Sequence, residues 1–254
     1  MSIVKVGCCG WAVRGGRRAY FKEFNLIEIQ STFYKLPRLE TALKWKEEAP
    51  ESFEFTLKAW QVITHSPKSP TWRRSGIKIS KETYDRYGFF RPTKENLEAW
   101  EKNLEICKAL NVKICIFQSP PSFRPVKENI KNMEIFFTTI ARGSIYLAWE
   151  PRGEWYKRPD LVKKLCDELD IIHVVDILKR KPLSSHDIAY IRLHGLNGDI
   201  NYKYKYTDED LIRLSEEVKW LIKEKNEIYV LFNNIYMAED AKRFLNILKR
   251  KGII

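Results

Sequence analysis

Charged side chains stand where otherwise apolar stretches of the sequence end. Three of them are the carboxylates Glu28, Glu150 and Asp176, and three are the cations Lys58, Arg152 and Arg192. A carboxylate whose pKa is tuned by neighbouring cations can act as a general acid or base, and we interpret Glu28 or Glu150 in this way. The same charges could instead form a structural ring of ion pairs, because perturbed carboxylates occur in both settings.

Two of the four histidines are candidates for proton transfer, namely His194 and His65. A lone histidine is more often structural, but His194 ends an apolar run beside Gly195, which favours a role in the site. The predicted catalytic set is Glu28, Glu150, Asp176 and His194. These four could also converge on one divalent metal ion, although no local motif such as His-x-x-x-His supports that alternative.

Further polar and aromatic residues suit the binding of a substrate. Arg and Lys side chains, with the Asn233-Asn234 pair, match a phosphate or carboxylate. Aromatic rings at five positions could wall a pocket, although rings more often only pack: Trp11, Phe33, Tyr34, Phe123 and Trp155. The predicted binding residues are Trp11, Gln30, Tyr34, Lys58, His65, Gln118, Arg152, Trp155, Arg192, Asn233 and Asn234.

Short β-branched runs that alternate with segments of helical period would bring these residues together. The eight predicted strands are Ile3–Cys8, Leu26–Ser31, Phe53–Lys58, Val112–Phe117, Ile145–Trp149, Ile171–Asp176, Ile188–His194 and Ile228–Asn233. The alternation predicts a parallel sheet, and eight strands with outer helices close as a (β/α)8 barrel whose reactive groups gather at the carboxyl ends of the strands. An open, doubly wound sheet is the lesser alternative.

The segments between the predicted strands are unequal. Residues 14–24 and 177–186 leave little room for a full helix, so we expect irregular crossovers after strands one and six. Residues 60–94 lack periodicity and are rich in Arg and aromatic residues, which indicates a long functional loop inserted after strand three. We treat residues 1–254 as one domain.

Several strings resemble one known family in the order in which they occur. They are Gly10-Trp11, Ser31-Thr32-Phe33-Tyr34, Lys58-Ala59 with Thr64-His65, Phe117-Gln118 with Pro120-Pro121-Ser122-Phe123, Glu150 with Arg152 and Trp155, Tyr190 with Arg192-Leu193-His194-Gly195, and Tyr229 with Phe232-Asn233-Asn234. Together they resemble the domain of unknown function 72 family, also called YecE-like. The resemblance implies a TIM barrel and a site at these residues but no reaction.

This chain departs from the family pattern at three places. Cys8-Cys9 stands where the family usually has Thr-Ser, and Gln30 stands where it has Asn. Gly153 replaces a histidine that commonly follows the Glu-x-Arg pair. Any role of that histidine is therefore absent here or is supplied by another residue.

Composition limits the class of protein and of partner. The 254 residues carry a net charge of +12, which favours anionic partners, either phosphorylated small molecules or nucleic acid. No run approaches the ~18 apolar residues of a membrane span. The five cysteines are an odd count without a Cys-x-x-Cys pair, so we interpret them as core thiols of a cytoplasmic protein. Abundant Glu and Lys are typical of thermophilic proteins.

Two functions follow from these observations. The first is an enzyme that uses acid–base chemistry on a small anionic substrate, phosphorylated or sugar-like. The second is a nucleic-acid-binding or processing protein whose loop 60–94 contacts phosphates through Arg73 and Arg74 and stacks its aromatic rings on bases. Aromatic rings exposed on that loop would also permit a homo-oligomer.

Overall fold

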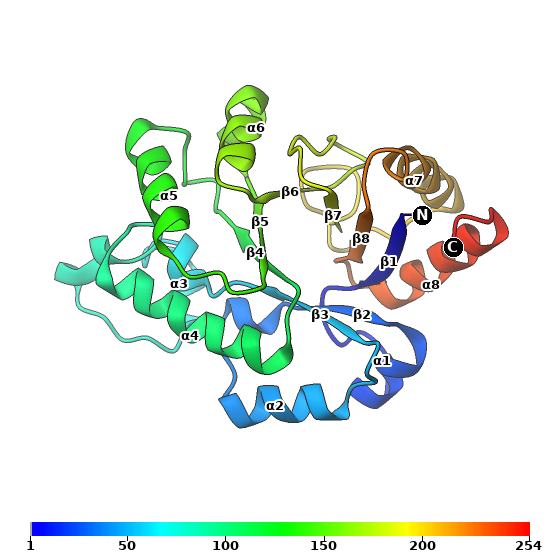
Figure 1. Ribbon diagram of the computed structural model, residues 1–254, viewed down its shortest axis with the longest axis horizontal. Coiled ribbons are helices and arrows are strands. Elements are labelled where there is room, and N and C mark those ends of the chain that lie inside the picture. Colours follow the sequence, from blue (N-terminus) through cyan, green and yellow to red (C-terminus); the bar gives the residue numbers. More distant parts are fainter. Residues whose placement is uncertain (1) are drawn as a thin grey trace.

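Eight parallel strands form a closed barrel in the computed structural model, which describes residues 2–254 (Figure 1). The strands are β1 Ile3–Cys8, β2 Leu26–Ile29, β3 Glu54–Lys58, β4 Ile114–Gln118, β5 Tyr146–Glu150, β6 Ile172–Val175, β7 Ile188–Leu193 and β8 Glu227–Phe232. Each strand pairs with the next, and β1 closes the barrel against β8 from Ile3 opposite Glu227 to Cys8 opposite Phe232. The predicted barrel is confirmed, and the open sheet is excluded.

Alternation along each strand explains why the barrel closes. In β4, Ile114 and Ile116 belong to the cluster of apolar side chains inside the barrel, whereas Cys115 and Phe117 belong to the larger cluster between the strands and the helices. Both faces of such a strand are covered, so the strand is a nearly continuous apolar run. This is the pattern on which the strand predictions were based.

Helices surround the barrel on its outside. They are α1 Arg17–Glu23, α2 Leu39–Glu48, α3 Gln61–Thr64, α4 Lys94–Leu110, α5 Lys127–Thr139, α6 Pro159–Glu168, α7 Asp208–Leu221 and α8 Met237–Arg250. One face of α7 is apolar and buried, and Thr207 and Asp210 form a complete capping box at its start. No helix among residues 2–254 is long and apolar enough to cross a membrane.

The two short crossovers differ from one another. After β6 the chain reaches β7 without a helix, as predicted. After β1 the prediction of an irregular crossover is wrong, because helix α1 makes two turns there. Only Tyr20 of α1 is buried, so this helix has no apolar stripe in the sequence. The Tyr20 hydroxyl instead anchors it by donating to the carbonyl oxygen of Leu26 at 2.8 Å.

The long segment 60–94 winds through short helical turns and packs its aromatic side chains inward. Phe90 is fully buried against Phe117 and Phe137, and Trp72 packs against Tyr87. The sequence predicted exposed rings in this segment, for stacking on bases or for contact with a second copy of the protein. Trp72 and Phe90 are buried, so their rings do not fit that prediction. Arg73 and Arg74, on the 3₁₀ turn Trp72–Arg74, do remain exposed.

A polar ring closes the amino-terminal end of the barrel, opposite the candidate site. Lys5 bridges Glu54 and Glu227 at 2.6 and 3.0 Å, and Lys113 contacts Glu227 at 2.7 Å. Polar side chains at this end of a TIM barrel are associated with stability. The five cysteines are all buried with free thiols, as the composition predicted.

Candidate functional site

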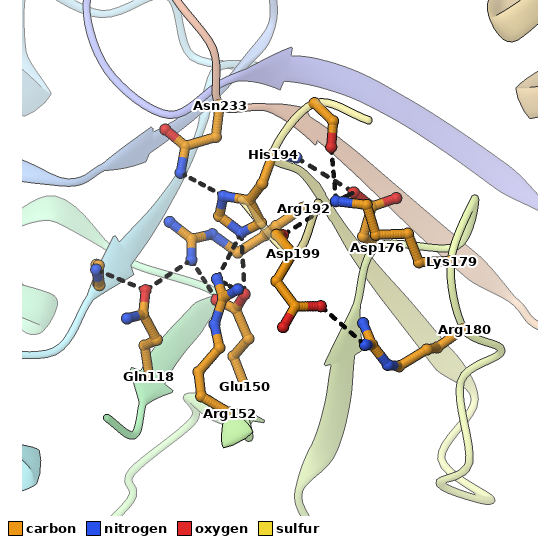
Figure 2. A network of polar contacts seen from close by, with 12 residues as sticks. Gln118, Glu150, Arg152, Asp176, Lys179, Arg180, Arg192, His194, Asp199 and Asn233 are labelled. Carbon is orange, nitrogen blue, oxygen red and sulfur yellow. Dashed lines mark hydrogen bonds and ion pairs between the residues drawn. The ribbon is translucent and has the colours of Figure 1, made fainter. Parts of the chain in front are cut away.

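Arg192, near the end of β7, is the centre of the charged network at the carboxyl ends of the strands. Its side chain is completely buried, and its Nη2 donates to Glu28 Oε1 at 2.8 Å. Its Nη1 contacts Glu150 Oε2 (Figure 2). The second oxygen of Glu28 accepts a hydrogen bond from the Tyr190 hydroxyl at 3.0 Å. A guanidinium offers donors in two directions, so one arginine can hold two carboxylates apart.

Glu150, the last residue of β5, is held by three partners. Besides Arg192, its carboxylate contacts Arg152 Nη2, and its Oε1 lies 2.9 Å from His194 Nε2. Burial alone would raise the pKa of this carboxyl, but the two guanidiniums outweigh burial and hold the pKa well below its usual range. Glu150 is therefore ionised at neutral pH and already satisfied by protein partners.

His194 follows β7 and is tied into the network at both ring nitrogens. Asn233 Nδ2 lies 3.2 Å from its Nδ1, and its Nε2 lies 2.9 Å from Glu150 Oε1 and 3.0 Å from Arg152 Nη2. Burial lowers the pKa of His194 to about 4, although the Glu150 carboxylate opposes the shift. The imidazole is therefore neutral near pH 7.

Lys58, the last residue of β3, has a different environment. Its Nζ donates to the Gln118 amide oxygen at 2.9 Å and lies 3.7 Å from the centroid of the Phe33 ring. It forms no ion pair with any carboxylate of residues 2–254. Burial, followed by the nearby Arg192 charge, lowers the pKa of the Lys58 amine to about 7.

A cleft of about 500 Å³ opens beside this network, over the ends of β1, β2 and β8. Its lining is Cys9, Gly10, Trp11, Ile29, Gln30, Ser31, Tyr34, Arg74, Tyr202, Asn233, Asn234, Ile235 and Met237. Asn233 belongs both to the cleft and to the network, since its amide reaches His194. Two buried polar atoms of the lining have no hydrogen-bond partner among the described residues, Trp11 Nε1 and Asn234 Oδ1.

Two features of the cleft limit the reactions that its side chains can perform. The guanidinium of Arg74 stacks on the ring of Tyr34 at 3.5 Å from its centroid and forms no ion pair with the described residues. Burial raises the pKa of the Cys9 thiol well above its ordinary value, so this cysteine is a thiol and not a thiolate at neutral pH. The cleft therefore presents a cation without a bound anion and no activated sulfur.

The predicted binding residues divide into three groups. Trp11, Gln30, Tyr34, Asn233 and Asn234 line the cleft, and Lys58, Gln118, Arg152 and Arg192 form the adjoining network. Two others do not face either. Trp155 is fully buried between Phe123 and Trp149 and does not line this cleft.

His65 is the second predicted residue that packs away from the cleft. Its ring meets Phe33 edge to face, and its Nδ1 lies 2.8 Å from the Thr64 hydroxyl. Burial lowers the pKa of His65 to about 3, so this histidine is neutral. It is a neighbour of the charged network and not part of the cleft lining.

Asp176, just after β6, lies on the other side of His194 from the cleft (Figure 2). Its carboxylate accepts from the backbone N–H groups of His194 and Leu178 and pairs with Lys179 at 3.3 Å. Burial raises the pKa of Asp176 despite these partners. The observed contacts of Asp176 serve to fix the backbone around His194.

The predicted metal set does not fit this geometry. No three His, Cys, Asp or Glu side chains among residues 2–254 are grouped so that they could hold a metal ion. The physical reason is the position of Arg192, whose guanidinium lies between Glu28 and Glu150, where a divalent cation would have to bind both carboxylates. The hypothesis of a shared metal at Glu28, Glu150, Asp176 and His194 is therefore wrong for this structure.

Three residues of the site were missed or given other roles by sequence reasoning. Tyr190 supports Glu28 from inside the barrel, and only its place in the family-like string had marked it. Arg74 was assigned to nucleic acid, yet it lines the cleft. Tyr202 lines the cleft from the loop after β7, at a position that no strand end or motif indicates.

Comparison with known proteins agrees with the fold and the resemblance. The family model described as protein of unknown function DUF72 matches residues 5–253. UPF0759 protein YunF of Bacillus subtilis is 23% identical over 288 residues, which cover 97% of this chain and 95% of that protein. A solved DUF72 family protein from Enterococcus faecalis V583 has a TM-score of 0.73 at 22% identity, with 98% of each chain covered.

More distant structures share the fold alone. A D-psicose 3-epimerase aligns with a TM-score of 0.56 at 11% identity, over 97% of this chain and 98% of that one. Endonuclease IV from Thermus thermophilus aligns with a TM-score of 0.51 at 12% identity, over 96% and 99%. The chain is thus a TIM-barrel protein that belongs to the DUF72 family, also known as UPF0759.

Proposed function

We propose that this protein is an enzyme that binds a small anionic substrate, phosphorylated or sugar-like, in the cleft and transforms it by acid–base chemistry. The observation that carries the proposal is a surplus of cations. The carboxylates Glu28 and Glu150 are matched by the guanidiniums of Arg192 and Arg152. Lys58 and Arg74 are left without a carboxylate partner among residues 2–254, so an anionic substrate would complete the charge balance.

Arg74 is the residue best placed to contact the anion. Because it stacks on Tyr34, its guanidinium is held at the cleft with its donors free for bidentate contacts to phosphate or carboxylate. The amide group of Gln30, which lines the cleft, adds a donor and an acceptor for the polar groups of a sugar-like substrate. The aromatic and apolar lining would exclude water around them.

In this proposal the acid–base group is Lys58, in place of the carboxylates that the sequence suggested. Glu28 is completely buried and held by Arg192 and Tyr190, and Glu150 is ionised between two guanidiniums. Both act in this proposal by positioning Arg192. A proton carrier works best when its pKa is near the working pH, and Lys58 meets that condition.

Binding of anions tests the proposal directly. Titration calorimetry would compare inorganic phosphate, glucose 6-phosphate and glucose, and NMR would follow any conversion of the bound sugar. We expect phosphate-bearing compounds to bind and Arg74→Ala to weaken them about tenfold to hundredfold, as the loss of a charge-assisted contact does. Arg73→Ala is the matched control, because Arg73 is exposed on the same 3₁₀ turn but does not line the cleft.

The outcome also separates the enzyme from a nucleic-acid-binding protein. The net charge of +12 supports nucleic-acid binding, but the aromatic contribution expected from residues 60–94 is lost where Trp72 and Phe90 pack inward. Binding of single-stranded DNA that weakens equally in Arg73→Ala and Arg74→Ala, without binding of sugar phosphates, would contradict our proposal.

A further inference from the structure

We propose that Lys58 is a nucleophile that forms an imine with the carbonyl group of an anionic aldehyde or ketone. The inference rests on the proposed function and names the substrate class for the network beside the cleft, to which Lys58 belongs. It is carried by the way in which the protein leaves this amine without a counter-charge while every other cation of the network has one.

The contacts of Lys58 include no carboxylate among residues 2–254. Its single hydrogen-bond acceptor is the neutral amide oxygen of Gln118, and its remaining contact is the face of Phe33. A buried ammonium is costly unless it is paired with a carboxylate. Both carboxylates close enough to influence it, Glu28 and Glu150, are already bound to Arg192.

Charges from every neighbouring element act on Lys58. Arg192 of β7 and Arg152 after β5 disfavour a second positive charge, whereas Glu28 of β2 and Glu150 of β5 favour it. His65, in the segment after β3, is neutral. Because burial and Arg192 prevail, the pKa of Lys58 falls to about 7, so about half of these side chains carry the free amine at pH 7, against about one in a thousand for an ordinary lysine.

The free amine is the form that attacks a carbonyl group. The Lys58 nitrogen forms a bond to the carbonyl carbon, and the carbonyl oxygen leaves as water with the two hydrogens of the amine. The resulting C=N bond takes a proton from solvent and becomes an iminium. Its positive charge withdraws electrons from the adjacent carbon, which eases removal of a proton or cleavage of a bond there. Gln118, whose oxygen holds the amine, orients the attack.

Lys179 provides an internal comparison. It lies at the same end of the barrel, and its Nζ is likewise largely shielded, with 14% of the side chain exposed. Yet it pairs with Asp176 at 3.3 Å and donates to the carbonyl oxygens of Gly195 and Asp199 at 2.6 and 3.0 Å. Lys179 is therefore a fully partnered ammonium and is not expected to attack a carbonyl.

Reductive trapping tests the inference on the full-length protein. Dihydroxyacetone phosphate is added at pH 7, sodium borohydride reduces any imine to a stable secondary amine, and peptide mass spectrometry locates the added mass. We expect labelling at Lys58 to exceed labelling at Lys179 about tenfold or more. Lys58→Arg keeps a cation but cannot form the imine, and should lose the label. Circular dichroism and thermal unfolding establish that this variant is folded.

Two results would overturn the inference. Equal labelling of the wild-type protein and Lys58→Arg would show that the adducts belong to other lysines. Absence of a Lys58 adduct while inorganic phosphate still binds, and Arg74→Ala still weakens it, would remove the imine but leave the proposed function standing. Should Lys58→Arg fail to fold, competitive acetylation of the wild-type protein across pH would decide, because Lys58 should react with a midpoint near 7 and Lys179 should not.

Discussion

Lys58 and Arg192 share one acceptor, the amide oxygen of Gln118, at 2.9 and 3.4 Å respectively. Two cations on one neutral oxygen repel each other, and only Arg192 has carboxylates to compensate for its charge. The amine therefore loses its proton more readily, since a guanidinium cannot be deprotonated under ordinary conditions. The unusual pKa of Lys58 is thus built in by the choice of an arginine as its neighbour.

Replacement of this amine should change how stability depends on pH. In the unfolded chain Lys58 has a pKa of about 10.4, and in the folded protein the value is about 7. Between these values the unfolded state binds more protons, so this group destabilises the fold at pH 7 and the penalty fades as pH rises. We expect Lys58→Met to be more stable than the wild type at pH 7, with the difference shrinking by about 1.4 kcal/mol per pH unit toward pH 9.

The measurement must compare the wild-type protein with Lys58→Met, because other groups also titrate in this pH range. Burial raises the pKa of the thiols of Cys8, Cys9, Cys107 and Cys166, which pulls wild-type stability downward above pH 8. The cysteines are common to both proteins and cancel in the difference measured by urea unfolding. A difference that stays constant between pH 7 and 9 would show that Lys58 keeps an ordinary pKa.

Neutralisation of Glu150 should destabilise the protein severely. Glu150→Gln leaves the guanidiniums of Arg152 and Arg192 buried and close together, and breaking a buried ion pair costs about 3–5 kcal/mol. Glu154→Gln is the matched control, because its pair with Arg124 is exposed to solvent and should contribute little to stability. Urea unfolding at pH 7 measures both free energies.

The pH dependence of the stability lost in Glu150→Gln follows from the direction in which the protein shifts the pKa of Glu150. The folded pKa of Glu150 is depressed, so its contribution is present above the unfolded value of about 4.3 and is lost as pH falls further. The gap between the wild type and Glu150→Gln should therefore narrow only below about pH 4. A gap that closes already between pH 7 and 5 would contradict the ion-pair explanation.

Buried histidines should make the protein sensitive to mild acid. Burial lowers the pKa of His65 to about 3 and those of His173 and His194 to about 4, whereas unfolded histidine titrates near 6.5. Between pH 6.5 and 5 the unfolded state takes up protons that the folded state refuses, so stability falls as pH is lowered. Each histidine contributes up to about 1.4 kcal/mol per pH unit.

The unfolding free energy measured at pH 6.5, 6 and 5 has a slope against pH, and this slope gives the number of protons that the unfolded state takes up. His173→Gln should reduce the slope by about one proton, since it removes one buried imidazole that does not line the cleft. A slope near zero in the wild-type protein would mean that the histidines titrate normally in the folded state.

A close backbone approach beside His194 should not tolerate a side chain. Gly195 has a φ of 79°, and a Cβ at this position would lie 2.1 Å from the carbonyl oxygen of Asn201. We expect Gly195→Ala to cost about 2 kcal/mol or more and to weaken phosphate binding, because the backbone hydrogen bond between Asn201 and His194 would shift. Gly198 also has a positive φ, of 131°, but open space around a Cβ, so Gly198→Ala should show the cost of backbone strain without the clash.

Sequence reasoning located the strands well because both of their faces are apolar. It missed α1, since a helix that buries only Tyr20 leaves no stripe to detect. It placed Glu28, Lys58, Glu150 and Arg192 at one end of the barrel, because parallel strands bring their carboxyl ends together.

The pairing of each cation with a particular carboxylate depends on strand register and on side-chain direction. Neither can be read from the sequence, because both are set by the three-dimensional fold. The pattern around Arg192 turns two candidate catalytic carboxylates into its supports and leaves Lys58 unpaired. Trp155 lies outside the cleft for a similar reason. Its position just after β5 suggested the mouth, but the 3₁₀ turn Gly153–Lys157 directs its ring into the core.

The pairing of β1 with β8 has a consequence for how the protein is made. Ile3 must find Glu227, so the barrel cannot close until nearly the whole chain has left the ribosome. At about 5–20 residues per second, β1 waits for its partner for roughly 10 to 50 seconds. During that interval its backbone is an unpaired strand edge, which favours aggregation unless a chaperone covers it. The open edge of β1 during synthesis is therefore an aggregation risk that the finished, closed barrel does not have.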